Sequence, residues 1–230
     1  MVKDKDLKKE ENLSEVENAL TKTEQFIEKN QKILTIVVGA IVVIVGGYLG
    51  FKKLYIQPLE KEAQSQMFMA EQYFEKDSFN LAINGDGNYL GFLDIIDDYN
   101  MTKAANVAKY YTGISYLHLG QFNDAINYLN EFETDDLLLA PVTEGAKGDA
   151  YSELDEKGKA LSAYEKAYSY KNNFTTPIYL MKAGLLLEAE GKFDDALEAY
   201  NEIKESYPES NEGRTIDKYI GRIKVQEKKK

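Results

Sequence analysis

The sequence predicts an all-α protein: a single N-terminal transmembrane helix, then an α-solenoid of about four helix pairs, then a C-terminal capping helix. Residues 33–51 contain no charged residue, and alanines in the rest of the chain recur at intervals of 35 and 36 residues. Signals for strands are weak, with no long alternating runs. The prolines lie where we expect helices to begin, a position that proline tolerates: Pro58, Pro141, Pro177 and Pro208.

The composition excludes several kinds of chemistry. The 230 residues include no cysteine, one histidine (His118), 39 acidic and 28 basic residues, and the net charge is −11. Disulfides, thiolate nucleophiles, cysteine zinc sites and multi-histidine metal centres are therefore excluded, and the excess of acid argues against a nucleic-acid groove. Serine–lysine or carboxylate catalysis stays open on composition alone. No catalytic motif appears, so we expect no enzyme, no cofactor and no metal.

Residues 1–32 are predicted to be a charged tail that contains a short amphipathic helix. Ser14 and Glu17 have the spacing of a capping box. The apolar residues that follow one helical stripe are Leu13, Val16, Leu20, Phe26 and Ile27. Because the charge is mixed rather than basic, a helix lying on a membrane or partner and a solvated helix both remain open.

Residues 33–51 are predicted to be the transmembrane helix. A helix of these 19 residues is about 28 Å long, close to the thickness of a hydrocarbon core. Lysines flank both ends, and Tyr48, Phe51 and Tyr55 cluster at the second end, where aromatic rings favour the interface. A cleaved signal peptide is disfavoured by the long charged region that precedes the segment. Lysines on the two sides nearly balance and leave the orientation open.

Three glycines of this segment form a predicted packing face. Gly46 and Gly50 have a small-xxx-small spacing, and Gly39 precedes Gly46 by seven residues, so all three lie on nearly the same side of the helix. Such a face lets another transmembrane helix approach closely. Glycine is also common in membrane helices without this role, and that alternative remains open.

After a linker at residues 52–58, residues 59–208 are predicted to form the repeats. The clearest unit runs from Pro177 to Pro208, PIYLMKAGLLLEAEGKFDDALEAYNEIKESYP. It places Gly184, Gly191, Phe193, Ala196, Tyr200 and Pro208 in an order that resembles the tetratricopeptide repeat (TPR). This pattern has a small residue in the first helix (helix A), a glycine in the turn, an aromatic, an alanine and a second aromatic in the second helix (helix B), and a closing proline.

Three further units share this register. Gly113 and Gly148 correspond to Gly184, and the helix B alanines are Ala125, Ala160 and Ala196. The preceding alanine, Ala82, lies 43 residues before Ala125, so the first unit is expected to contain an insertion, NGDGN at 84–88, that interrupts its helix B. Residues 84–88 have calcium-ligand character, but an EF-hand register lacks both anchoring carboxylates. We interpret the insertion as a turn.

Residues 209–230 are predicted to be a capping helix and a charged tail. Ile216, Tyr219, Ile220 and Ile223 recur at helical spacing, and lysines follow. An open-ended solenoid needs such an amphipathic end.

Stacked repeats form a concave groove lined by helix A, which is the predicted protein-binding site. The residues at groove positions are Met67, Glu71 and Phe74 in the first unit, Tyr110, Ile114 and Leu117 in the second, Asp149 and Ser152 in the third, and Met181, Leu185 and Glu188 in the fourth. The lysines and asparagines that clamp a C-terminal carboxylate in some TPR domains are absent. Methionine and aromatics flanked by acid favour an adaptable apolar groove for unfolded or amphipathic segments, although several of them could instead pack between repeats.

The whole arrangement resembles the bacterial YfgM-like family of ancillary SecYEG translocon subunits. The segments QSQMFMAEQYFEKDSFNLAINGDGNYLGFLDIIDDYNMTKAANVAKYYTGISYLHLGQ and FTTPIYLMKAG are similar to a Bacteroidota branch of such membrane-anchored TPR proteins. The resemblance implies a cytoplasmic N-terminal tail, a single-pass anchor in the bacterial inner membrane and a periplasmic TPR domain. It also implies protein partners: translocon subunits, and exported chains or periplasmic chaperones.

The function expected from these features is that of a non-enzymatic membrane adaptor. The Gly39, Gly46 and Gly50 face would dock on translocon helices, and the groove would receive exported chains or chaperones. The alternative is a homo-oligomeric scaffold for envelope or cell-division assembly, in which the same face joins two copies. Most of the acidity belongs to the repeats, because residues 1–32 contain seven lysines and eight acidic residues. This charge keeps the repeats soluble and away from anionic lipid.

Overall fold

The computed structural model describes the backbone of residues 3–227 and the side chains of residues 24–226. It divides into two units, Met1–Pro58 and Leu59–Lys230. The predicted capping box at Ser14 and Glu17, and the stripe residues Leu13, Val16 and Leu20, lie outside the described side chains. The described residues form helices and turns and no strand, so the all-α prediction is confirmed.

The first unit is a long helix, α1 (Lys3–Phe51), that ends with the apolar segment. The most apolar stretch of the described helix has a mean hydropathy of 2.5 and is not buried by any other part of the described chain. By length and composition this helix can cross a membrane.

The predicted linker at 52–58 is helical. Residues Lys52–Ile56 form a π-helix, η1, and α2 (Gln57–Glu75) follows at once. Pro58 has no N–H to donate and its ring crowds the carbonyl four residues earlier. The wider π turn before Pro58 accommodates both effects, so the helix continues where a new start was expected.

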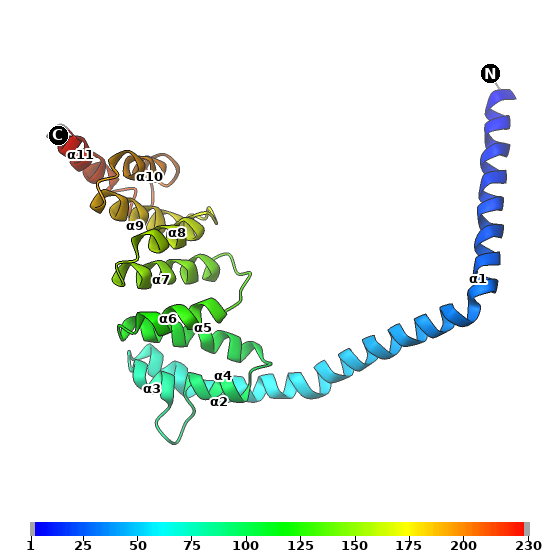
Figure 1. Ribbon diagram of the computed structural model, residues 1–230, viewed down its shortest axis with the longest axis horizontal. Helices are drawn as coiled ribbons and strands as arrows, with labels where there is room; N and C mark the ends of the chain where they lie inside the picture. Colours follow the sequence, from blue (N-terminus) through cyan, green and yellow to red (C-terminus); the bar gives the residue numbers. More distant parts are fainter. Residues whose placement is uncertain (1–2, 228–230) are drawn as a thin grey trace. The chain divides into compact units, whose positions relative to one another are not determined.

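The second unit is a stack of helix pairs (Figure 1). Its helices after α2 are α3 (Phe79–Asn84), α4 (Phe92–Asp98), α5 (Lys103–His118), α6 (Phe122–Glu131), α7 (Leu139–Glu153), α8 (Lys157–Tyr168), α9 (Thr176–Ala189), α10 (Phe193–Ser206) and α11 (Ile216–Glu227). Helix α5 packs on α6, α7 on α8 and α9 on α10, and each pair packs on the next. The predicted solenoid is confirmed.

Within each of the last three pairs, a glycine of helix A receives a large side chain of helix B. A Cβ atom at Gly184 would lie 2.3 Å from the Tyr200 ring, and one at Gly148 would lie 2.5 Å from the Tyr164 ring. In the second unit Leu129 takes the aromatic position, 2.6 Å from a Cβ at Gly113. Only glycine permits these approaches without displacing the neighbour.

Alanine and glycine perform the same role elsewhere in the stack. Ala125, Ala160 and Ala196 are fully buried, as predicted for the positions where helix B meets its neighbours. Between the third and fourth pairs, a Cβ at Gly145 would lie 1.9 Å from the Tyr179 ring. The predicted small residues therefore let large rings fill the space between helices.

The turns between helix A and helix B all contain one residue with positive φ. Gly120 and Gly191 have φ of 72° and 75°, whereas Asp77 and Asp155 reach 55° and 57° in the first and third units. Aspartate tolerates this left-handed region better than most residues with a Cβ atom. The turn at 155–157, which lacks the expected glycine, therefore has the same backbone path as the others.

The insertion interrupts helix B of the first unit, as predicted. Helix α3 ends at Asn84 and α4 begins at Phe92, and a Cβ at Gly91 would lie 2.4 Å from the backbone nitrogen of Gly85, so the two ends of the loop meet. The Asp86 carboxylate accepts hydrogen bonds from the N–H groups of Asn88 and Tyr89, and from the Tyr73 hydroxyl of α2 at 2.8 Å. These bonds lower the pKa of Asp86, with the Tyr89 N–H as the main cause. The loop is a closed turn fixed to helix A.

The capping helix begins later than Pro208. The chain makes turns until α11 starts at Ile216, and the Ser210 hydroxyl stabilises them by accepting from the Gly213 N–H at 2.9 Å. A helix start at Pro208 was the wrong expectation, because this proline follows the end of α10 rather than preceding a helix. Ile216, Ile220 and Ile223 are buried against α10 and its neighbours, as predicted.

The close glycine contacts predict a large cost for one added methyl group. We expect Gly184→Ala to lower the free energy of unfolding by about 1–3 kcal/mol, because its Cβ would overlap a buried ring. The measurement is urea denaturation of the full chain in detergent micelles, followed by circular dichroism. Gly158→Ala is the matched control, since no atom lies within 4 Å of its Cβ position on α8. Equal stability of the two variants would contradict the packing described.

Candidate protein-binding groove

The predicted groove residues of the first unit lie mainly in the core. Met67 is only 5% exposed and packs with Ala63, Ala70 and their neighbours, so it has little surface to offer a ligand. Phe74 is half-buried, and its ring meets those of Phe79, Phe92 and Tyr111 at centroid distances of 5.6, 6.4 and 4.9 Å. Placing these two residues in the groove therefore needs correction. The broken helix B brings α4 and α5 onto this part of α2, which covers them.

Glu71 stands beside this aromatic cluster and is half-buried. Burial raises the pKa of its carboxyl, and the negative charge of Glu75 adds to the shift. A charged carboxylate is thus disfavoured in this position relative to water.

The second unit contributes an apolar strip. Tyr110, Ile114 and Leu117 are half-buried on α5, and the Tyr110 ring packs on Phe132 at 5.3 Å. His118 is exposed, and its ring stacks on the Phe79 ring, with centroids 4.5 Å apart and planes 1° from parallel. These residues keep part of their surface free.

In the fourth unit the three predicted groove residues differ in how accessible they are. Leu185 is exposed, and Met181 is half-buried against the C-terminal core. The Glu188 carboxylate accepts from Arg222 of the capping helix at 2.6 Å and from the Tyr200 hydroxyl at 3.1 Å. Glu188 therefore fastens the capping helix, and its carboxylate is already engaged.

Helices α5 and α7 enclose a cleft of about 500 Å³. Its lining residues come from the C-terminal parts of these two helices, the turn after α5, the start of α6 and the partner helix α8: Leu117, His118, Gly120, Phe122, Asp149, Ser152, Glu153 and Tyr164. Of the groove residues predicted from sequence, the cleft brings together Leu117, Asp149 and Ser152. Apolar and acidic groups meet here within one opening.

Asp149 organises the centre of the groove. Its two carboxylate oxygens each lie 2.6 Å from Lys182 Nζ, and Oδ1 also accepts from the Tyr164 hydroxyl at 2.9 Å. Burial raises the pKa of Tyr164 and of Tyr179, and the Asp149 charge raises both further. Lys182, Tyr164 and Tyr179 were not predicted as groove residues. The pairing of Asp149 with Lys182 joins two repeats 33 residues apart, which no local pattern reveals.

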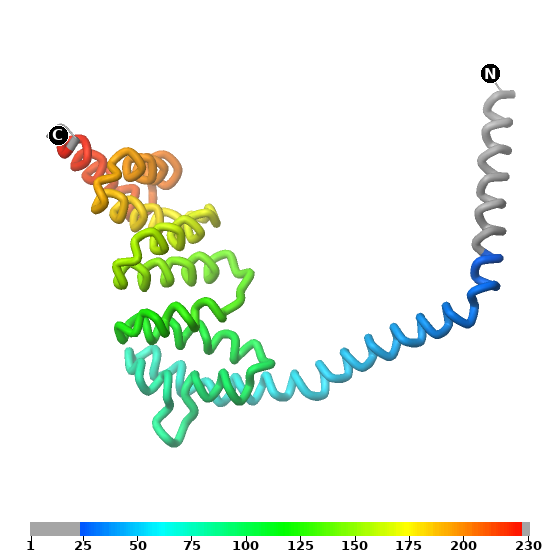
Figure 2. Tube along the Cα trace, in the orientation of Figure 1, coloured from blue at the N-terminus to red at the C-terminus, as the bar shows by residue number. Residues whose placement is uncertain are grey.

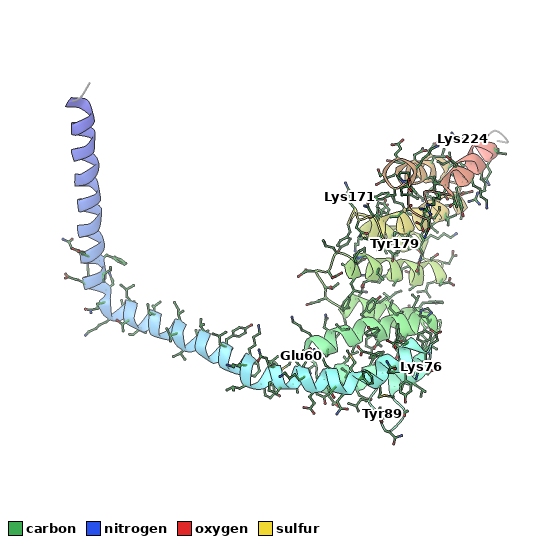
Figure 3. All side chains as sticks on the ribbon, turned by 180° about the vertical axis from the view of Figure 1, so that it is seen from behind. Glu60, Lys76, Tyr89, Lys171, Tyr179 and Lys224 are labelled. Carbon is green, nitrogen blue, oxygen red and sulfur yellow. The ribbon has the colours of Figure 1, made fainter. Side chains whose placement is uncertain are left out.

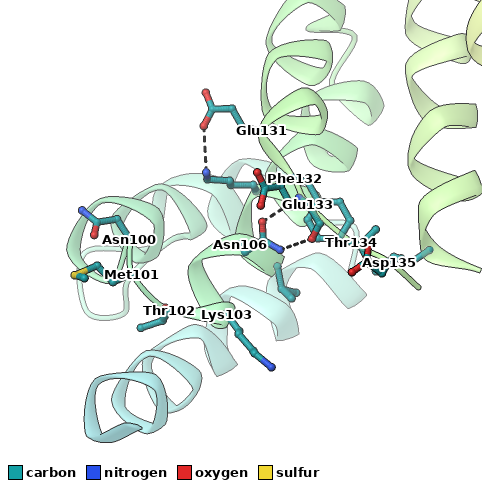
Figure 4. A pocket seen from close by; sticks show the side chains of 13 residues that line it. Asn100, Met101, Thr102, Lys103, Asn106, Glu131, Phe132, Glu133, Thr134 and Asp135 are labelled. Carbon is teal, nitrogen blue, oxygen red and sulfur yellow. Dashed lines mark hydrogen bonds and ion pairs between the residues drawn. The ribbon is translucent and has the colours of Figure 1, made fainter. Parts of the chain in front are cut away.

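A second cleft, of about 1060 Å³, opens where α5 begins and α6 ends (Figure 4). The Asn106 side chain lies at its centre and binds the backbone of Glu133 twice, donating to the carbonyl at 2.7 Å and accepting from the N–H at 3.0 Å. Lys109 and Glu131 form an ion pair of 3.4 Å at its rim. The predicted groove does not include these residues.

The three glycines of the apolar helix lie free of other groups. No atom comes within 4 Å of a Cβ placed at Gly39, Gly46 or Gly50. A helix-packing role for this face stays a prediction.

Comparison with known proteins supports the repeat assignment. The family model described as "Tetratricopeptide repeat" matches residues 107–135 and 179–210. A search of curated proteins found no match. Two solved structures are similar to this chain. The first, titled "Crystal structure of MamA protein", has 20% identity, a TM-score of 0.52 and coverage of 70% of this chain and 87% of that one. The other, "Crystal structure of MamA", has 21% identity, a TM-score of 0.50 and coverage of 70% and 95%.

The chain therefore contains tetratricopeptide repeats and shares a fold with these two structures. Such repeats are protein-interaction scaffolds. The similarity to the YfgM-like family has no support in these comparisons and stays part of the proposal below.

The raised pKa of Glu71 predicts how stability depends on pH. The folded state binds the proton more tightly than the unfolded chain, so this residue stabilises the fold below the ordinary carboxyl pKa and loses that contribution as pH rises through the folded value. Glu71→Gln should therefore remove a fall in stability that sets in as the pH rises from the ordinary carboxyl pKa toward neutrality. Urea denaturation across this range measures the effect, with Glu165→Gln on the exposed face of α8 as control. A steeper fall in the Glu71→Gln variant would contradict the assignment.

Proposed function

We propose that the chain is a non-enzymatic, membrane-anchored TPR adaptor of the SecYEG translocon. Residues 1–32 are its cytoplasmic tail, residues 33–51 its inner-membrane anchor, and residues 59–208, closed by the capping segment 209–230, its periplasmic binding domain. The observation that supports this most is the combination of a helix able to cross a membrane with a repeat domain that contains an open cleft between α5 and α7. The orientation and the translocon follow from the resemblance of the sequence to the YfgM-like family.

The groove in this proposal receives exported chains or periplasmic chaperones. Its exposed and half-buried apolar residues, Ile114, Leu117 and Leu185, offer contacts to apolar side chains without demanding one sequence. The exposed carboxylate of Glu153 beside them favours segments that also contain lysine or arginine. Emerging chains with mixed apolar and basic residues match this surface.

The absence of native cysteine allows the groove to be tested by single-cysteine crosslinking. Ser152→Cys places a thiol in the cleft on α7, and we expect it to form adducts with exported polypeptides or chaperones when a thiol-reactive crosslinker is added to intact cells. Ser162→Cys, an exposed position on α8 in the same repeat, is the matched control. Equal yields from both positions would contradict a binding role for the cleft.

The anchor is tested by purifying the chain from gently solubilised membranes. We expect translocon subunits to co-purify, and Gly46→Leu with Gly50→Leu to reduce their recovery about tenfold, because a close helix contact is lost. Ile41→Phe with Ile44→Phe adds bulk to the opposite side of the helix and is the control. Repeated absence of translocon subunits would refute the adaptor.

The alternative, a homo-oligomeric scaffold, rests on the same exposed glycine face. Two copies could pack through Gly39, Gly46 and Gly50 as easily as one copy packs on a translocon helix. Sedimentation of the detergent-solubilised chain separates the two functions: a tight dimer that the glycine variants dissociate favours the scaffold.

A further inference from the structure

One edge of the repeat domain is the side where the first helix of each pair begins. Hydrogen bonds join its successive parts: the Lys103 N–H donates to the Glu60 carboxylate at 2.6 Å, and the Asn172 amide donates to the Leu137 carbonyl at 3.3 Å. Figure 2 shows the connections α4–α5, α6–α7 and α8–α9 along this side. Glu60 and Lys171 lie on it in Figure 3, and Lys76 lies on the other edge. We call residues 59–62, 99–103, 132–139 and 169–176 the entry edge.

Large apolar side chains are exposed along the entry edge. Phe174 is 74% exposed, Leu137 70% and Met101 56%, and Leu138 and Tyr170 are exposed beside them. The opposite edge consists of the turns at 76–78, 119–121, 154–156 and 190–192, and none of the large apolar side chains in those four turns is exposed. Exposed apolar groups are thus concentrated on the longer connections of the entry edge, which indicates an interaction surface.

Several backbone N–H groups of these connections are hydrogen-bonded within the chain. Asp136 accepts from the N–H groups of Leu138 and Leu139, both at 2.8 Å. Asn172 accepts in the same way from Phe174 at 2.9 Å and Thr175 at 2.7 Å. Leu138 and Phe174 therefore project from turns in which their own N–H groups are hydrogen-bonded, which lowers the cost of approaching an apolar phase.

The covalent path places this edge near the anchor. The domain begins with Leu59, whose neighbour Glu60 binds Lys103 on the entry edge. Only residues 52–58 separate Leu59 from the end of the apolar segment, and even a fully extended link of that length spans about 25 Å. Whatever angle the two units adopt, the start of the entry edge stays within this distance of the membrane that contains the anchor.

We propose that the entry edge docks on the lipid bilayer, with Phe174, Leu137, Leu138 and Met101 seated in the interface of the membrane that contains the chain's own anchor. This inference rests on the membrane anchoring proposed above. Acidic residues Glu133, Asp135 and Asp136 stand beside the apolar groups, so neutral phosphatidylcholine headgroups suit this edge and anionic lipid opposes its docking. Docking lays the repeats along the membrane surface and leaves the groove open to chains that emerge there.

The absence of native tryptophan gives a direct test. Phe174→Trp in the full chain, reconstituted into phosphatidylcholine vesicles with acyl chains brominated near the headgroup, should lose about half its fluorescence relative to unbrominated vesicles, since aromatic rings at this depth contact the bromines. Gln121→Trp on the opposite edge should keep its intensity. Tyr48→Trp, toward the interfacial end of the apolar segment, reports on the anchor and should be quenched.

The outcomes separate this inference from the proposed function. Quenching of Tyr48→Trp without quenching of Phe174→Trp would overturn the docking and leave the anchor standing, whereas loss of quenching at both would overturn both. A shift of the Phe174→Trp emission that depends on protein concentration and not on bromine would show that a second copy covers the edge, against the inference.

A second variant pair confirms that the apolar side chains are responsible. Leu137→Glu with Leu138→Glu should reduce the quenching of Phe174→Trp to the level of the opposite edge. Gln121→Glu with Asn123→Glu adds the same charge to the opposite edge and should leave the quenching unchanged. Equal effects of the two pairs would assign any quenching to overall charge and overturn the docking.

Discussion

The approach of a large side chain onto a glycine is the contact on which the repeat domain depends. Tyr164, Tyr200 and Leu129 each occupy the space that a Cβ atom would fill on the paired helix, and Tyr179 does the same between repeats at Gly145. These contacts set the distance between helices at values that no larger residue allows. Glycine and alanine recur at regular intervals in the sequence because each repeat needs small residues at these contacts. The stack of helix pairs results from the same contact in successive repeats.

The same packing determines what remains for binding. The rings of Tyr164 and Tyr179 face helix A glycines and are buried, so the groove surface is left to the apolar strip of α5 and to the charged centre at Asp149 and Lys182. Both charges of this ion pair stay about one-third exposed, which limits the pair's contribution to stability. The main effect of the ion pair is to place polar groups in the groove beside Leu117 and Ile114. A groove of this kind discriminates by charge and accepts varied apolar groups.

Much of the fold was predictable because it depends on short-range patterns. The uncharged run at 33–51, the glycine and alanine spacing, and the interrupted helix at 84–88 each have a direct physical meaning. The errors arose where distant parts of the chain decide. Met67 and Phe74 are covered by α4 and α5. Glu188 is bound by Arg222 at a separation of 34 residues. Pro58 follows a π turn that lets the helix continue past it. The charged groove centre depends on such a distant pair as well.

In the function that we propose, a TPR groove is held at a membrane and receives polypeptide segments at the translocon. Electron cryomicroscopy of the complex purified from native membranes in lipid nanodiscs tests it most directly. We expect a translocon helix against Gly39, Gly46 and Gly50, and an extra polypeptide segment along α5 and α7. A complex that contains only copies of this chain, with an empty groove, would contradict it.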